Sequence, residues 1–141
     1  MTKVDFYLLG AGGDSRERTA CRLTEKAWRL GNRVYLLAPD KPAAQELDDL
    51  LWTFSQGSFV PHAVCGQDVD TDVHPVLIGH AEPPAALSDV LISLSPDVPA
   101  WFSRFTRVAE LVGTTEDDKA LGRDHYRFYR ERGYPLETHN L

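Results

Sequence analysis

The residues best suited to chemistry lie near the carboxyl end of the chain, where basic and aromatic side chains recur at helical spacing. Residues 114–134 predict one helix that begins with acidic residues and ends at Gly133. At 3.6 residues per turn its basic side chains share about a quarter of the circumference, and Leu121 and Phe128 point the opposite way. These basic residues are Lys119, Arg123, Arg127 and Arg130. One face of the helix is therefore predicted to pack on the protein and the other to attract anions.

The charge of this helix contrasts with that of the rest of the chain. Residues 119–132 hold five basic and two acidic residues, a net charge of +3, whereas the remaining residues hold ten basic and nineteen acidic ones, a net charge of −9. A basic ridge on an acidic body concentrates the electrostatic field at one place. A solvated helix face is the ordinary explanation of such a run. Tyr126 favours a binding surface, because it shares the basic side, where the core needs no aromatic residue.

No set of residues in the chain predicts catalysis. The histidines are scattered along the chain and fit neither a metal-ligand spacing nor a Ser-His-Asp arrangement. They are His62, His74, His80, His125 and His139. The acidic pairs Asp48-Asp49 and Asp117-Asp118 lie in predicted helices, where capping and solvation explain them. We therefore expect no metal site, no cofactor and no catalytic residue.

A glycine-rich turn over residues 10–13 follows the first predicted strand and is typical of nucleotide binding. Glycines at such a turn let a pyrophosphate approach the N-terminus of a helix. Here Ser15 stands where the dinucleotide motif has its third glycine, and Asp14 would repel phosphate. No Lys-Ser/Thr pair follows, which excludes a Walker-type phosphate loop. A degenerate nucleotide-binding, Rossmann-like enzyme is kept as the alternative function.

Large apolar side chains are concentrated between residues 51 and 61. They are Leu51, Trp52, Phe54, Phe59, Val60 and Pro61, interrupted by a Gln-Gly turn. This is more apolar volume than one helix end ordinarily buries. Core packing explains it about as well as a protein interface does, since aromatic anchors beside proline-containing loops are typical of binding hot spots.

The rest of the chain alternates strands with helices. Strands are predicted over residues 4–9, 33–38, 75–79, 89–94 and 106–112. Asp14 or Ser15 is expected to cap a first helix that ends at Gly31-Asn32, and Asp40 to cap a second. A short helix is expected from residue 99, a turn over residues 56–62 and an acidic loop over residues 67–74. The pattern predicts one three-layer α/β domain over residues 1–141, with a mostly parallel central sheet flanked by helices and a Rossmann-like topology.

Length and composition fit a soluble protein with an ordinary core. The 141 residues are 43% hydrophobic and 26% charged, with a net charge of −6 and a pI near 5.3. An acidic chain is ill suited to gripping nucleic-acid phosphates as its main task. Cys21 and Cys65 lack metal-ligand spacing, which favours free thiols in a reducing compartment. No signal peptide precedes the first strand and no apolar run approaches the ~20 residues of a membrane span, so we expect a cytoplasmic protein.

Several segments match one known family in collinear order over nearly the whole chain. They are residues 5–9, 27–29, 31–34, 51–52, 58–62 and 89–94, followed by Lys119, Arg123, Tyr126, Tyr129, Arg130, Gly133 and Tyr134. The string Ser-Phe-Val-Pro-His at residues 58–62 is the most specific of them. On these residues the chain resembles the chi subunit family of bacterial DNA polymerase III. The short insertions and the glycine-rich first loop depart from the family pattern, and they fall where loops vary.

The resemblance implies a non-enzymatic bridging protein with two binding surfaces. One surface would bind the psi subunit of the clamp loader, and by position it matches Trp52, Phe59, Val60 and Pro61. The other would bind the acidic C-terminal tail of single-stranded DNA-binding protein (SSB), through Lys119, Arg123, Tyr126 and Arg127, with Val112, Leu136 and Thr138 as pocket walls. Arg127 stands where the family also has lysine, which keeps the charge but changes the hydrogen-bond geometry. Arg130 is expected to help hold the aspartates of the tail, so that nucleic acid would be reached only indirectly.

Direct binding of single-stranded DNA is a further alternative. Bases stack on aromatic side chains, and Tyr126 and Tyr129 lie among the arginines of the last helix. The acidic remainder of the chain argues against this alternative.

Overall fold

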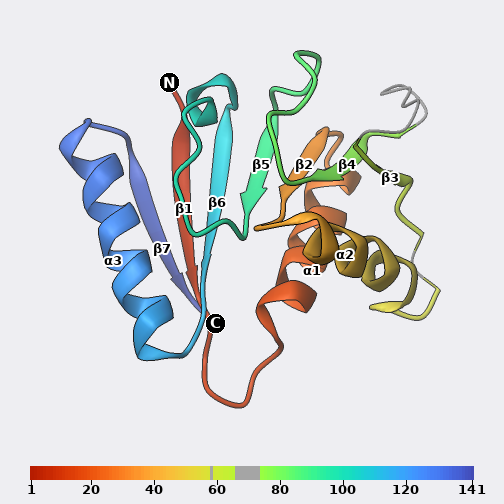
Figure 1. Ribbon diagram of the computed structural model, residues 1–141, viewed down its shortest axis with the longest axis horizontal. Helices are drawn as coiled ribbons and strands as arrows, with labels where there is room; N and C mark the ends of the chain where they lie inside the picture. The colour runs from red at the N-terminus through yellow and green to blue at the C-terminus, as the bar shows by residue number, and fades with distance from the viewer. Residues whose placement is uncertain (58, 66–73) are drawn as a thin grey trace.

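The computed structural model describes residues 1–57, 59–65 and 74–141 and contains one parallel sheet. Within these residues the strand order is β3-β4-β2-β5-β6-β1-β7, and every pairing is parallel (Figure 1). The strands are β1 (Lys3–Leu8), β2 (Val34–Leu37), β3 (His62–Val64), β4 (Val76–Gly79), β5 (Val90–Ser93), β6 (Arg107–Val112) and β7 (Leu136–Asn140). The helices are α1 (Arg16–Arg29), α2 (Lys41–Thr53), α3 (Glu116–Glu131) and the short 3-10 helix η1 (Phe102–Arg104).

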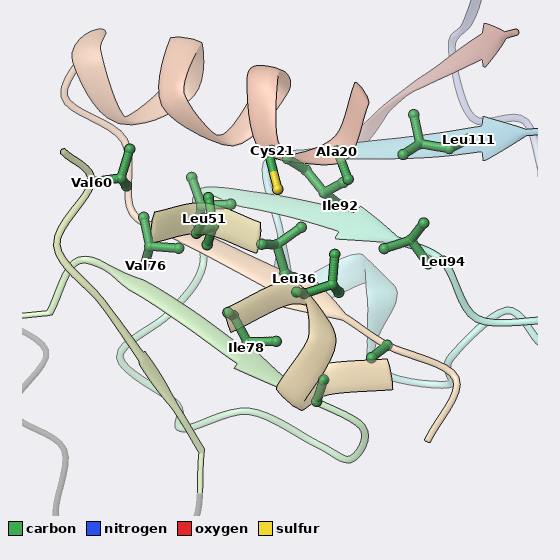
Figure 2. Close-up of a cluster of buried hydrophobic side chains, with 14 of the residues drawn as sticks. Ala20, Cys21, Leu36, Leu51, Val60, Val76, Ile78, Ile92, Leu94 and Leu111 are labelled. Atoms are coloured by element: carbon green, nitrogen blue, oxygen red, sulfur yellow. The ribbon is translucent and has the colours of Figure 1, made fainter. Parts of the chain in front are cut away.

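Two hydrophobic clusters, one on each face of the sheet, make the molecule a three-layer α/β structure. Helices α1 and α2 bury Ala20 and Leu51 against one face, together with strand residues such as Leu36 and Ile92 (Figure 2). On the other face α3 and η1 pack against the strands. That second cluster includes Phe6, Tyr35, Leu91, Phe102, Val108 and Tyr129. In Figure 1 α3 lies beside β7 and β1, whereas α1 and α2 lie beside β2 and β4. The predicted fold class is therefore confirmed.

Local signals position the helices as the sequence predicts. The Ser15 side chain accepts a hydrogen bond from the Arg18 N–H at the start of α1, and Asp40 does the same for Ala43 at the start of α2. Helix α3 is capped by Thr115 and has only acidic residues in its first turn, where negative charge favours the helix dipole. Gly31, with φ of 91°, follows α1 and allows the left-handed turn that ends it.

Two strands were not predicted. The turn expected over residues 56–62 ends in β3, and the polar segment Leu136–Asn140 forms β7 at the edge of the sheet. An edge strand needs no continuous apolar run, because one side and much of one face meet solvent. The short helix expected from residue 99 is reduced to one turn, η1. Ser58 and residues 67–73 of the expected acidic loop lie outside the described residues.

Candidate functional site

A pocket of about 320 Å³ lies between α3 and the carboxyl ends of β1 and β6. We call it the α3 pocket. Its walls are mainly apolar on the sheet side, while α3 contributes polar and aromatic groups. It is lined by Phe6, Leu8, Leu9, Val112, Gly113, Lys119, Gly122, Arg123, Tyr126 and Thr138. Such a combination suits a ligand with one apolar group and a negative charge.

The cations at this pocket are largely free for a ligand. The Arg123 side chain is exposed, and it makes no ion pair or hydrogen bond with the part of the chain that the structure describes. The Lys119 ammonium lies 3.9 Å from Glu116 across the helix surface. An exposed pair of this kind contributes at most about 1 kcal/mol, so it would yield readily to a bound anion.

Tyr126 forms the aromatic wall of the pocket. Its ring centroid lies 5.2 Å from that of Phe6 at an interplanar angle of 60°, which holds the half-buried tyrosine against β1. The Arg130 guanidinium is 6.0 Å from the same ring, at the outer limit of a cation–π contact. Tyr126 therefore separates the apolar floor of the pocket from the basic helix surface.

A buried polar cluster anchors α3 to the sheet beneath this pocket. His125 donates from Nδ1 to Glu110 Oε1 at 3.0 Å and from Nε2 to the Pro96 carbonyl at 2.8 Å. The Tyr129 hydroxyl donates to Glu110 Oε2 at 2.9 Å. Burial disfavours the charged imidazole, but the hydrogen bond and charge of Glu110 outweigh it, so the pKa of His125 is raised. An imidazole that donates a hydrogen bond from each ring nitrogen carries two N–H groups, which is the charged form of histidine.

Most of the residues expected at the tail-binding site lie at this pocket. Lys119, Arg123, Tyr126, Val112 and Thr138 line it. Arg127 and Arg130 lie outside the lining, exposed on α3, and Arg127 is 3.9 Å from Asp124. Leu136 was expected as a pocket wall, but it packs half-buried in the core cluster below α3 instead. Leu136 shares a face of β7 with Thr138, but it pairs with Val4 rather than Phe6 and so lies about 7 Å further from the carboxyl end of β1.

Other lining residues escaped the sequence analysis. Phe6 and Leu8 come from β1, Leu9 and Gly113 follow β1 and β6, and Gly122 comes from the middle of α3. The parallel register pairs Phe6 with Glu110 and with Thr138, which brings three distant segments together. Only Gly122 carried a sequence signal, since glycine within a strong helix is unfavourable and calls for a reason.

Tyr129 cannot stack on a nucleic-acid base in this structure. Its side chain is 0% exposed and hydrogen-bonded to Glu110. The expectation that Tyr126 and Tyr129 form a joint stacking surface is therefore wrong. Helical periodicity gives the angle between two side chains around the helix axis. It does not say which face of α3 is turned toward the sheet.

A second candidate surface is formed by the exposed rings of Trp52 and Phe59. These side chains are 53% and 59% exposed, and their ring centroids lie 5.7 Å apart. Leu51 and Phe54 are buried in the core, so the apolar string is divided between the core and the surface. We call the exposed pair, with half-buried Pro61, the Trp52–Phe59 patch.

Val60 was expected to belong to this patch, but the structure places it elsewhere. Val60 is 1% exposed and packs in the cluster beneath α1 and α2 (Figure 2). The alternation of an extended chain explains this, because neighbouring side chains point to opposite sides. Val60 thus anchors the loop that carries Phe59.

His62 supports the patch from below. Its Nδ1 lies 2.6 Å from the Val60 carbonyl, and its Nε2 lies 3.2 Å from both the carbonyl and the Oδ1 of Asp48. The Trp52 ring centroid is 4.6 Å from the imidazole. These contacts join α2 to the loop before β3 and hold Trp52 in place.

The glycine-rich turn borders a crevice of about 370 Å³ between the N-termini of α1 and α3. It lies at the carboxyl edge of the sheet, where doubly wound folds bind nucleotides. Its charged lining is Asp14, Glu17 and Asp118 against Arg16. Asp14 is also paired with Arg18 and Arg22. The lining itself still presents three carboxylates and one arginine, which disfavours phosphate and argues against the nucleotide-binding alternative.

One group of possible metal ligands was not foreseen. Parallel pairing of β1 with β7 brings Asp5, Glu137 and His139 together. Arg107 donates to Asp5 at 2.7 Å and Lys3 to Glu137 at 2.6 Å. Burial opposes ionisation of Asp5, but the hydrogen bonds from His139 and Arg107 outweigh it and lower its pKa. The positive charges of Arg107 and Lys3 already neutralise these carboxylates, so an ion-pair network explains the group without a metal ion.

The parallel sheet with helices on both faces defines a three-layer α/β protein. Among solved structures, the crystal structure of T4 UvsW shares the fold with a TM-score of 0.66 at 10% identity, and the match covers 99% of this chain and 42% of that chain. Residues 1–137 match the model of the family "DNA polymerase III chi subunit, HolC". The chain therefore belongs to the DNA polymerase III chi subunit family.

Two curated relatives match the chain over nearly their full length. The chain is 44% identical to DNA polymerase III subunit chi of Pseudomonas aeruginosa, covering 100% of this chain and 98% of the relative. It is 30% identical to the Escherichia coli subunit chi, covering 98% of this chain and 97% of the relative. No helix within the described ranges combines the length and the apolar character that a bilayer crossing requires.

Proposed function

We propose that this protein is a non-catalytic accessory subunit in DNA replication, which bridges the clamp loader to SSB in the cytoplasm. The α3 pocket would bind the acidic C-terminal tail of SSB, and the Trp52–Phe59 patch would bind the psi subunit. Membership of the chi family supports the replication role. The observation that carries the bridging role is the α3 pocket itself, an apolar cavity whose rim holds Arg123, which pairs with none of the described residues.

The chemistry of the pocket matches the end of an acidic polypeptide. A terminal carboxylate would accept charge-assisted hydrogen bonds from Arg123, and the last apolar side chain would enter beside Tyr126. Aspartates further from the end would lie along Lys119, Arg127 and Arg130. An exposed ion pair contributes only about 0 to 1 kcal/mol, so the apolar contact and the Arg123 carboxylate bond must supply much of the free energy. Affinity in the micromolar range is expected, about −8 kcal/mol in total.

Fluorescence anisotropy with a labelled tail peptide tests this assignment. Arg123→Ala should weaken binding by at least about 30-fold, because Arg123 is the cation proposed to hold the terminal carboxylate. Arg132→Ala is the matched control, because it removes the same charge from the end of α3, where Arg132 stacks on Phe128 away from the pocket. Equal affinities of wild type and Arg123→Ala would refute the tail site.

The Trp52–Phe59 patch supports the proposed psi contact. Two exposed aromatic rings held by buried neighbours are pre-organised, which lowers the entropic cost of binding. Aromatic residues are also enriched among binding hot spots. Co-purification with the psi subunit of the same organism should fail for Phe59→Ala. Retained co-purification would remove the patch from the proposal.

A further inference from the structure

We propose that Gly122 sets the width of the α3 pocket and, with it, the size of the terminal side chain that the pocket admits. Gly122 lines the pocket from the middle of α3, opposite Val112 of β6. This inference rests on the proposed tail site and adds a residue that determines its specificity.

The contact between Gly122 and Val112 leaves no room for a side chain. A Cβ atom placed on Gly122 would lie 2.8 Å from Val112 Cγ2 and 2.9 Å from Val112 Cγ1. Carbon atoms in contact ordinarily lie about 3.5–4.0 Å apart. Glycine is unfavourable in a helix interior compared with alanine, so its presence here has a steric explanation. It allows the backbone of α3 to approach β6.

Val112 cannot easily move to accept a larger neighbour. It is 7% exposed, belongs to the core cluster under α3, and is β-branched, which restricts its rotamers. Gly122 and Val112 both line the pocket, so the volume of a methyl group at position 122 would be taken from the pocket. It would narrow the space between Tyr126 and the floor formed by Phe6 and Leu8.

The consequence for a ligand depends on the size of its last side chain. A terminal Phe needs the full depth of the pocket, whereas a terminal Ala needs little of it. The Arg123 side chain is exposed and has several rotatable bonds, so its bond to the terminal carboxylate can adapt when the ligand sits less deeply. Narrowing the pocket should thus penalise large terminal side chains selectively.

A double-mutant cycle with three labelled acidic peptides, ending in Phe, Leu or Ala, tests the inference by anisotropy. Gly122→Ala should weaken binding of the Phe-ended peptide by about tenfold and of the Ala-ended peptide by less than about twofold. Introduced into the Val112→Ala variant, the same substitution should cost less than about twofold for every peptide, because the two clashing γ-carbons are gone. Equal losses in the two backgrounds, or equal losses for all peptides, would overturn the inference.

Controls separate this contact from folding and from the tail site. Ala120→Gly, an exposed position on α3, weakens the helix without touching the pocket and should leave all three affinities unchanged. If Gly122→Ala does not fold, the double variant must still fold and bind like Val112→Ala, and its failure to fold would contradict the inference. Binding that is lost in Arg123→Ala but unchanged in Gly122→Ala refutes the role of Gly122 alone. A wild type that binds no peptide overturns the tail site together with it.

Discussion

The α3 pocket and the Trp52–Phe59 patch are both proposed to bind proteins, but they are built in opposite ways. The pocket is concave and mainly apolar inside, with the cations Lys119 and Arg123 among its lining residues, and it lies between one helix and three strands. The patch consists of exposed aromatic rings on one short segment, with little charge of its own. Each rests on a buried histidine whose two ring nitrogens face oxygens, His125 under the pocket and His62 under the patch. Similar histidine anchors can therefore support surfaces as different as a pocket with a cationic rim and an exposed aromatic patch.

The largest expected effect comes from removing the anchor of the pocket. His125→Ala leaves the Glu110 carboxylate buried without its charged partner, which should lower the free energy of unfolding by about 3 kcal/mol. Urea unfolding followed by circular dichroism measures this loss. His80→Ala, at an exposed position, should change the unfolding free energy by less than about 0.5 kcal/mol. A loss at His125 no greater than that of the control would show that Glu110 and His125 do not anchor α3.

The same anchor predicts a dependence of stability on pH. The pKa of His125 is raised from its ordinary 6.5, so the folded protein binds this proton more tightly than the unfolded chain. The contribution of protonated His125 to the free energy of unfolding is complete below pH about 6.5, and it is lost as the pH rises through the raised pKa. Unfolding free energies measured across this range should fall more steeply with pH in wild type than in His125→Gln. Parallel curves would contradict the assignment of the charged form.

The next largest effect separates the two surfaces. Tyr126→Ala should weaken tail-peptide binding by about 2 kcal/mol without changing binding of psi, and Phe59→Ala should do the reverse, since aromatic anchors dominate such contacts. Titrating both variants with both partners makes the comparison. If either variant weakens both partners equally, the two surfaces are coupled and their separation is wrong.

Salt should distinguish the two modes of recognition. Raising the ionic strength from about 0.01 M to about 0.1 M shortens the Debye length from about 30 Å to about 10 Å and should weaken tail-peptide binding by about 1 kcal/mol. Binding through the Trp52–Phe59 patch should change little, because apolar contact is not screened. Isothermal titration at both salt concentrations measures the difference. Equal salt dependence would remove the distinction between charge and apolar recognition.

The smallest expected effect concerns the rim of the pocket. Lys119→Gln should cost about 0.5 kcal/mol in tail-peptide affinity, the contribution of one exposed ion pair. Lys26→Gln removes the same charge from an exposed position on α1 and serves as the matched control in the anisotropy titration. A cost above about 2 kcal/mol would place Lys119, rather than Arg123, at the terminal carboxylate.

The features that the sequence predicted are those that depend on neighbours along the chain. The caps at Ser15 and Asp40 and the three-layer parallel arrangement are confirmed. Strand β7 was missed because its polar residues lack the pattern of a buried strand. Val60 was assigned to the psi-binding surface by its position in the family pattern, which does not say which side of an extended segment faces the core.

The α3 pocket was predicted only in part from the sequence. Helical spacing placed Lys119, Arg123 and Tyr126 on one face of α3, as the pocket lining bears out. The rotation of α3 on the sheet could not follow from that spacing, and it buried Tyr129 while leaving Tyr126 accessible. Leu136 was assigned to the pocket by its position in the family pattern, which does not give the register of β7 against β1.

The sequence alone determined which residues carry charge, which are apolar, and how they repeat along each helix and strand, because these properties follow from covalent structure and local geometry. Only the tertiary structure decided that Phe6 and Thr138 meet α3, and that Trp52 and Phe59 stay exposed while Val60 is buried. Those outcomes depend on strand register and on the close approach of Gly122 to Val112. Register and helix packing are set by contacts between distant segments, and such contacts form only when the whole sheet has assembled.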